Sequence, residues 1–172
     1  KGQGYHKGTV HASISPSMDI QVSSNFERAL FDAYGRDGNA VAQLMAELGQ
    51  GGFEVSQGAM QALQGLYKSG RASEAETSAT IAHMLKHTGE LLCPHSAVGV
   101  KVAQDHRDDA TPMITLATAH PAKFPDAVEA ATGHRPGLPE RMQDLFERPE
   151  RLTRVANDLG ALKAHIQRSL NA

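Results

Sequence analysis

Apolar residues recur along most of this chain with the spacing of an α-helix. From Asn25 to Gly35, and again from Asp37 to the run GQGG, apolar positions lie three and four residues apart, which predicts two amphipathic helices, the second capped by Asp37. Ser56 is a good cap for a third helix. The inward residues expected in that helix are Met60, Leu63, Leu66 and Tyr67.

The best-defined helix start in the chain comes next. Ser73 followed three residues later by Glu76 has the pattern of a capping box, so a fourth helix is predicted from Ser73 to about His87. Pro94 suits the first position of a fifth helix. That helix has little polar face and should be largely buried.

The C-terminal part of the chain is again predicted to be helical. A helix is expected from about Lys123 to Thr132, with Gly133 as its stop, and a short helix follows from Pro139. The chain closes with an amphipathic helix. Its expected inward residues are Leu159, Leu162, Ile166 and Leu170.

One segment has the character of a strand. Residues 113–117 (MITLA) are too few for a helix between their flanking turns and apolar enough for a parallel strand buried on both faces. Such a strand needs parallel neighbours that this sequence barely supplies, so we expect them elsewhere in the polypeptide. The predicted fold class is therefore α/β and helix-dominated, with few strands of its own.

Two regions are distinguished along the chain. Residues 1–22 read as a loop and extended segment, with Ser-Pro-Ser as a turn, and their start at Lys1 with Gly and polar residues is expected of the interior of a longer parent chain. Residues 23–172 are expected to form the helical and α/β portion.

Composition and charge exclude several classes of protein. The chain has 172 residues, 40% of them apolar, with 17 Lys and Arg against 19 Asp and Glu, which suits one globular domain with a sizeable core. The basic residues are scattered, so neither a nucleic acid nor a membrane surface is an expected partner. No apolar run reaches the roughly 20 residues that span a bilayer. A single cysteine, Cys93, fits a reducing cytoplasm.

The polar cluster TAHPAK follows the predicted strand. Ligands of open α/β sheets gather where strands end and the next helix begins. Thr118 lies at that point, and its hydroxyl can meet a ligand heteroatom without bringing a charge; His120 and Lys123 follow at the entrance of the next helix. The alternative is that Thr118 closes a turn and the other two residues are solvated.

Other polar clusters carry weaker signals. His83 and His87 have a spacing that can hold a metal, but no third ligand is near, and a solvated helix face is favoured, so no metal is predicted. Cys93 beside His95 is better explained as a buried structural cysteine than as an activated thiolate. The acidic turn with Asp105, Asp108 and Asp109 is expected to be solvated. The sequence contains no Gly-rich phosphate loop.

Long ordered stretches carry a resemblance to a known family. SPSMDIQVSSNFERALFDAYGRDG, CPHSAVGVKVA, LATAHPAKFPDAVEAATG and LPERMQDLFERPER occur in this order. From about Val10 onward they resemble the C-terminal part of bacterial threonine synthase. The resemblance implies the tryptophan-synthase-like fold, that is, the C-terminal portion of the large domain of a fold type II enzyme that uses pyridoxal 5′-phosphate (PLP).

The resemblance also implies a reaction. The family converts O-phosphohomoserine and water to L-threonine and phosphate, a carbon–oxygen lyase reaction, with PLP on a Schiff-base lysine. In the family, that lysine and the loop that binds the cofactor phosphate lie in the part of the sequence that precedes the matched stretches. No catalytic residue is therefore expected in this chain, and the chain alone is expected to be inactive. The lysines present do not match the family's cofactor lysine: Lys1, Lys7, Lys68, Lys86, Lys101, Lys123 and Lys163.

The resemblance assigns site residues as expectations. Thr118 is implied to lie near the pyridine nitrogen of PLP, and His120, Lys123 and His95 to shape its pocket. Cys93 stands where the family pattern has an acidic residue, so this chain departs from the pattern there. For the substrate side, Asn25, Arg28 and Asp19 lie in a stretch expected to line the entrance, and Arg28 suits bidentate phosphate binding, with a surface salt bridge as the alternative.

Three other expectations complete the prediction. The competing function is a non-catalytic module that retains this fold portion and binds a small molecule or a protein. A metal-binding helical protein built on the pair of histidines is a weaker reading. If residues 113–117 lack their sheet neighbours, their exposed apolar surface should lead to self-association.

Overall fold

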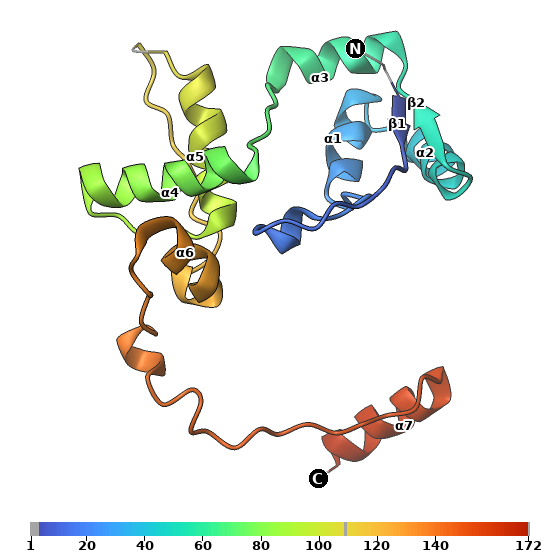
Figure 1. The fold of residues 1–172 in the computed structure, drawn as a ribbon. Helices are drawn as coiled ribbons and strands as arrows, with labels where there is room; N and C mark the ends of the chain where they lie inside the picture. The colour runs from blue at the N-terminus through green and yellow to red at the C-terminus, as the bar shows by residue number, and fades with distance from the viewer. Residues whose placement is uncertain (1–3, 109, 172) are drawn as a thin grey trace. The chain divides into compact units, whose positions relative to one another are not determined.

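The computed structural model describes residues 4–108 and 110–171, and these residues divide into two units, up to Gly137 and from Leu138 onward. In the first unit a short antiparallel pair, β1 (Gly4–His6) and β2 (Gly52–Glu54), places Tyr5 opposite Phe53. Around it lie α1 (Phe26–Ala33), α2 (Gly38–Gly49) and α3 (Gln57–Leu66), as Figure 1 shows.

Local capping explains where these helices begin. The Asp37 carboxylate accepts hydrogen bonds from the N–H groups of Asn39 and Ala40 and starts α2, and the Ser56 hydroxyl accepts from Ala59 N–H and starts α3. Both caps were predicted. The buried core of this part consists of Leu30, Val41, Leu44, Leu48, Phe53, Val55, Ala59 and Leu63.

Tyr5 ties the N-terminal segment to this core. Its ring stacks on Phe26 and Phe53, with centroid distances of 5.9 and 5.4 Å. Its hydroxyl donates to the carbonyl of Gln21 and accepts from Ser23 N–H. The aromatic contacts and the two hydrogen bonds together hold both ends of the loop between β1 and α1.

The second part of the first unit contains α4 (Glu74–Thr88), α5 (Pro94–His106) and α6 (Pro125–Thr132). Helix α4 crosses α5 and also contacts α6 (Figure 1). The predicted capping box is confirmed: Ser73 Oγ accepts from Glu76 N–H, and the Glu76 carboxylate accepts from Ser73 N–H. Hydrogen bonds to the Glu76 carboxylate from the N–H and the hydroxyl of Ser73 and from Lys101 lower the pKa of Glu76 to about 2. The helices enclose a small core of Ile81, Leu92 and Ala97.

The predicted helix from Lys123 to Thr132 is interrupted. A single 3-10 turn, Pro121–Lys123, is separated from α6 by Phe124, whose φ of −134° and ψ of 54° are not helical. The reason is Pro125, because a proline disfavours the helical conformation of the residue before it. The predicted stop is confirmed: Gly133 has φ +72° and ends α6 in the left-handed region.

The prediction of a strand at 113–117 is wrong for the described structure. These residues are assigned no secondary structure, and Ile114 and Leu116 are 81% and 78% exposed. A strand exists only through hydrogen bonds to a neighbour, and in the described residues β1 and β2 pair with each other alone. The segment therefore remains an extended, apolar and unpaired stretch.

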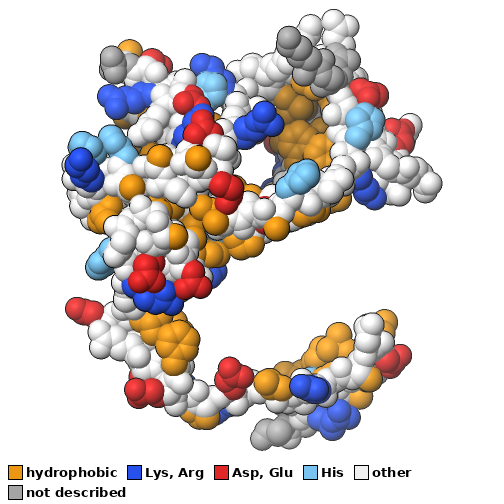
Figure 2. Space-filling model, viewed as in Figure 1, with side chains coloured by type: hydrophobic (Ala, Val, Ile, Leu, Met, Phe, Trp, Pro, Cys, Tyr) orange, Lys and Arg blue, Asp and Glu red, His pale blue; other side chains and the backbone are white. Residues whose placement is uncertain are grey.

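The second unit, taken by itself, contains a 3-10 turn (Glu140–Met142) and α7 (Leu159–Leu170), which Asp158 caps. The expected inward face of α7 is exposed, and hydrophobic side chains gather on this helix in Figure 2. Its residues are Leu159, Leu162, Ile166 and Leu170, exposed by 66, 46, 49 and 79%. The periodicity predicted the helix correctly, but the prediction that this face is inward is wrong.

Smaller differences concern burial. Leu66 and Tyr67, expected to face inward, lie at the end of α3 and are 78% and 59% exposed. In α5 the first turn is buried and the later turns are only partly covered, so the helix is less enclosed than predicted. Lys and Arg side chains lie interspersed with Asp and Glu on the face seen in Figure 2. Among the described residues, no helix is both long and apolar enough to cross a membrane.

Leu30→Ala should destabilise the first unit by about 2–5 kcal/mol, because Leu30 is fully buried in the core and its truncation leaves a cavity. Leu66→Ala is the matched control, since that side chain is already 78% exposed and should cost less than about 0.5 kcal/mol. Urea unfolding followed by circular dichroism measures both. Equal midpoints for the two variants would contradict the assigned core.

Candidate functional site

The first turn of α5 is buried and carries polar side chains. Cys93 is the N-cap residue, and its sulfur accepts a hydrogen bond from Ser96 N–H at 3.4 Å. Pro94 occupies the first helical position, where its fixed φ is suited and no N–H is needed. Every residue from Cys93 to Ala97 is buried. The chain thus presents two neutral polar side chains, Cys93 and Ser96, from a rigid, enclosed helix start.

Thr118 is bound to this turn from a distant part of the sequence. Its N–H donates to Ser96 Oγ at 3.0 Å, and the two hydroxyl oxygens lie 3.3 Å apart. Cys93 Sγ lies 3.2 Å from Ser96 Oγ and 3.8 Å from Thr118 Oγ1. The three side chains form one hydrogen-bonded cluster, which has no formal charge when the thiol is protonated and which we call the Cys93–Ser96–Thr118 cluster.

A hollow of about 370 Å³ opens beside the cluster. The residues of the cluster line it, and Thr118 is exposed. Its lining residues are Glu90, Leu91, Leu92, Cys93, Ser96, Ala117, Thr118, Ala119, His120 and Pro121. Two of the residues predicted to contact the cofactor, Thr118 and His120, therefore line the same hollow.

The cluster also shifts the acidity of the thiol. Burial raises the pKa of Cys93, but hydrogen bonds from Ser96, Thr118 and the Ala119 N–H outweigh it, so the pKa lies below its ordinary value. Since donors converge on the sulfur, Cys93 acts here mainly as a hydrogen-bond acceptor.

His120 and Lys123 take different positions. His120 caps the 3-10 turn: its Nδ1 accepts from Ala122 N–H at 3.1 Å, which leaves the proton of the neutral ring on Nε2. The Lys123 ammonium lies 5.8 Å from the centroid of the Phe124 ring, a cation–π contact. Lys123 does not belong to the lining of the hollow within the described residues.

His95 makes contacts that join two segments of the chain. Its Nε2 accepts the Ser17 N–H at 3.0 Å, and its ring packs on Phe124 at a centroid distance of 4.6 Å. The side chain is 6% exposed, and Nδ1 has no hydrogen-bond partner in the described residues. His95 thereby attaches the 3-10 turn Pro16–Met18 to α5.

The expected substrate-side residues lie elsewhere in the first unit. Asn25 occupies the N-cap position of α1 without a side-chain cap bond, and Arg28 is exposed on the same helix. No ion pair of Arg28 occurs among the described residues, which leaves its guanidinium accessible. Asp19 has an ordering role, because its carboxylate accepts from the N–H and the hydroxyl of Ser13.

The residues considered as metal ligands in the sequence are the histidine pair of α4 and the acidic turn at the end of α5. His83 and His87 lie side by side with centroids 4.3 Å apart and are both exposed. Within residues 4–108 and 110–171, no group of three or more His, Cys, Asp or Glu is placed to hold a metal. In the acidic turn, Asp105 pairs with Lys101 and Asp108 accepts two backbone N–H groups, while Asp109 lies outside the described residues.

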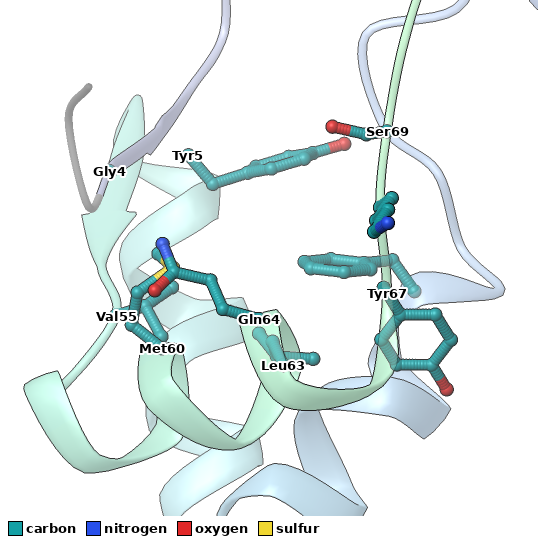
Figure 3. A pocket seen from close by; sticks show the side chains of 10 residues that line it. Gly4, Tyr5, Val55, Met60, Leu63, Gln64, Tyr67 and Ser69 are labelled. Atoms are coloured by element: carbon teal, nitrogen blue, oxygen red, sulfur yellow. The ribbon is translucent and has the colours of Figure 1, made fainter. Parts of the chain in front are cut away.

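A second hollow, of about 320 Å³, has a different character (Figure 3). Its walls are mostly apolar and come from β1, the start of α1, the residue after β2, α3 and the segment after α3. The side chains of Tyr5, Met60, Leu63 and Tyr67 are among those that line it. None of the predicted site residues lies there, so it is not a candidate for the cofactor.

Sequence reasoning missed Ser96. The motif CPHS was noted for His95 and Cys93, whereas Ser96 makes the contacts to Thr118. A signal was present, because a serine three residues after an N-cap lies in the first helical turn, where its side chain can reach an incoming segment.

Comparisons with known proteins all point to one family. A family model described as threonine synthase, C-terminal, matches residues 96–166, which include Ser96, Thr118, His120 and Lys123. Threonine synthase of Pseudomonas aeruginosa is 47% identical over 173 residues, which are 99% of this chain and 37% of that protein. Threonine synthase of Saccharomyces cerevisiae is 34% identical and covers 94% of this chain and 36% of its own length.

Solved structures give the same result. The crystal structure of PLP-bound threonine synthase from Brucella melitensis superposes with a TM-score of 0.87 at 47% identity, over 99% of this chain and 37% of that one. The yeast threonine synthase gives 0.80 at 31% identity, over 99% of this chain and 39% of that one. The fold is thus that of a PLP enzyme, helix-dominated with few strands of its own, as the sequence predicted.

Among PLP enzymes, the comparisons identify one family. The chain corresponds, over nearly its whole length, to the C-terminal part of threonine synthase, which confirms the resemblance seen in the sequence. It spans a little over a third of the length of these relatives.

His95 should make stability depend on pH. Burial, and then the charge of Lys123, lower its pKa below 6.5, against an opposing contribution of Asp19. The folded state therefore binds fewer protons than the unfolded state, and the stabilisation present above pH 6.5 is lost as the pH falls below it. We expect the free energy of unfolding to fall between pH 7.5 and 5.5, and to fall less in His95→Gln, which keeps an acceptor for Ser17 N–H.

The matched control is His87→Gln, at an exposed histidine on α4. Urea unfolding at a series of pH values measures all three proteins. The same pH dependence in the wild type and in His95→Gln would contradict the assigned role of His95.

Proposed function

We propose that this chain forms the C-terminal part of the PLP-binding domain of a cytoplasmic threonine synthase. The overall reaction consumes O-phosphohomoserine and water and yields L-threonine and inorganic phosphate. The observation that carries the proposal is the Thr118 hydroxyl, held by Ser96 at the wall of a hollow in a chain 47% identical to a PLP-bound enzyme.

The chemistry of the cluster fits the pyridine end of PLP. A ring nitrogen is a hydrogen-bond acceptor, and a threonine hydroxyl can donate to it without adding charge. The hydroxyl and sulfur groups nearest to Thr118 are also neutral when the thiol is protonated. When bound, PLP supplies an electron-accepting ring for substrate carbon chemistry. The part of Thr118 in that chemistry is to hold the ring in place and keep its nitrogen hydrogen-bonded.

The neighbouring residues are assigned lesser roles. His120 shares the wall with Thr118 and would close the pocket at the start of the 3-10 turn. Lys123 adds positive charge in this region, as its influence on His95 indicates, and would favour an anionic ligand. His95 would act by fixing the turn at Ser17.

Arg28 is our candidate for the substrate phosphate. Its exposed guanidinium offers a planar set of donors that matches phosphate oxygens, and Asn25 precedes it by one helical turn. Neither residue takes part in bond making. In this proposal, the covalent cofactor lysine and the loop for the cofactor phosphate are supplied by other residues of the enzyme.

Thr118→Val in the full-length enzyme should weaken PLP binding about three- to tenfold, the range of one net hydrogen bond between neutral groups. The absorbance of bound PLP and the turnover of O-phosphohomoserine should change with it. Thr111→Val, in the same exposed segment, is the control and should bind PLP normally. An unchanged affinity and spectrum in Thr118→Val would remove Thr118 from the site.

The purified chain of residues 1–172 should release no phosphate from O-phosphohomoserine, because none of its lysines matches the cofactor lysine. Titration with PLP followed by borohydride should leave no stoichiometric adduct on one lysine. A PLP-dependent release of phosphate would refute this prediction, and an adduct mapped to Lys123 would move that residue into the catalytic machinery. A non-catalytic module would show neither result, and it would also lack turnover in the full-length protein.

A further inference from the structure

We propose that Ser96 is the positioning residue for Thr118: it fixes both the backbone and the hydroxyl of Thr118, so that the Thr118 O–H is available to donate into the hollow. The proposal rests on the function proposed above, in which Thr118 contacts the ring nitrogen of PLP. It adds a residue that does not itself touch the cofactor.

The two contacts of Ser96 fix different degrees of freedom. The hydrogen bond from Thr118 N–H to Ser96 Oγ, at 3.0 Å, places the backbone of Thr118. The distance of 3.3 Å between the two hydroxyl oxygens restricts the side-chain rotamer. The segment before Thr118 has no secondary structure, so it does not supply this precision by itself.

Ser96 and Thr118 differ in burial. Ser96 is 2% exposed in the first turn of α5, and its neighbours Pro94 and Ala97 are buried as well. Thr118 is exposed beside the hollow. The geometry of the ligand-facing hydroxyl is therefore taken from the helix.

The donors and acceptors of the cluster can form a continuous relay. Ser96 Oγ has one proton, which it can give either to Cys93 Sγ at 3.2 Å or to Thr118 Oγ1 at 3.3 Å. When an acceptor occupies the hollow, the Thr118 proton points to that acceptor. The Ser96 proton then turns to Thr118 Oγ1, and each bond strengthens the next. Cys93 remains an acceptor of backbone N–H groups.

The test is a double-mutant cycle in the full-length enzyme, with PLP affinity and the absorbance spectrum of bound PLP as readouts. Ser96→Ala, Thr118→Val and the double variant are compared with the wild type. Thr80→Val is the control, since Thr80 is also a buried hydroxyl, bonded to the Glu76 carbonyl on α4 and absent from the lining of the hollow among the described residues.

We expect Ser96→Ala to weaken PLP binding about three- to tenfold when Thr118 is intact, and to add less than about twofold in the Thr118→Val background. Ser96→Cys keeps a donor and an acceptor of similar size and should recover part of the affinity. If the alanine variant does not fold, Ser96→Cys with and without Thr118→Val gives a cycle of the same form, in which we expect a smaller coupling.

The outcomes separate the two proposals. Equal losses from Ser96→Ala in both backgrounds, or no loss in either, would overturn the positioning role while leaving Thr118 as a cofactor contact. If instead Thr118→Val alone leaves PLP affinity and spectrum unchanged, the function proposed for Thr118 fails. A loss of affinity in Thr80→Val as large as that in Ser96→Ala would also overturn the specific role of Ser96.

Discussion

The first turn of α5 is the point on which the rest of the candidate site depends. It is buried, and two segments far away in the sequence are attached to it by side-chain hydrogen bonds. His95 accepts from Ser17 N–H, and Ser96 accepts from Thr118 N–H. The acceptor side chains of both bonds are buried, so the loss of either donor leaves a buried polar group unpaired. The short run CPHS therefore connects two segments that are far from it in the sequence.

Two parts of the chain contribute to the candidate site in different ways. An irregular segment brings the hydroxyl to the hollow, and a helix start holds it there. The cluster is built from a thiol and two hydroxyl groups, so its hydrogen bonds are short-ranged and directional, without the long-range field of an ion pair. Such a set favours a neutral heteroatom over a charged one, which is consistent with the pyridine nitrogen of PLP as its partner.

The sequence predicted features that depend on residues close together. The caps at Asp37 and Ser73 and the stop at Gly133 were found because each involves residues within a few positions of one another. The strand at 113–117 and the inward face of α7 were wrong because burial and pairing require partners distant in the sequence, and the described structure contains none for them. Thr118 was named as a candidate from its place after an apolar run and from the family resemblance, whereas the contact of Ser96 with it appears only in the folded structure.

The most direct test of this account is a crystal structure of the full-length protein with PLP bound. We expect Thr118 Oγ1 within about 2.7–3.1 Å of the pyridine nitrogen, with Thr118 N–H still donating to Ser96 Oγ. A structure in which another side chain holds the ring nitrogen, and the Thr118 hydroxyl turns away from it towards Cys93, would contradict the account.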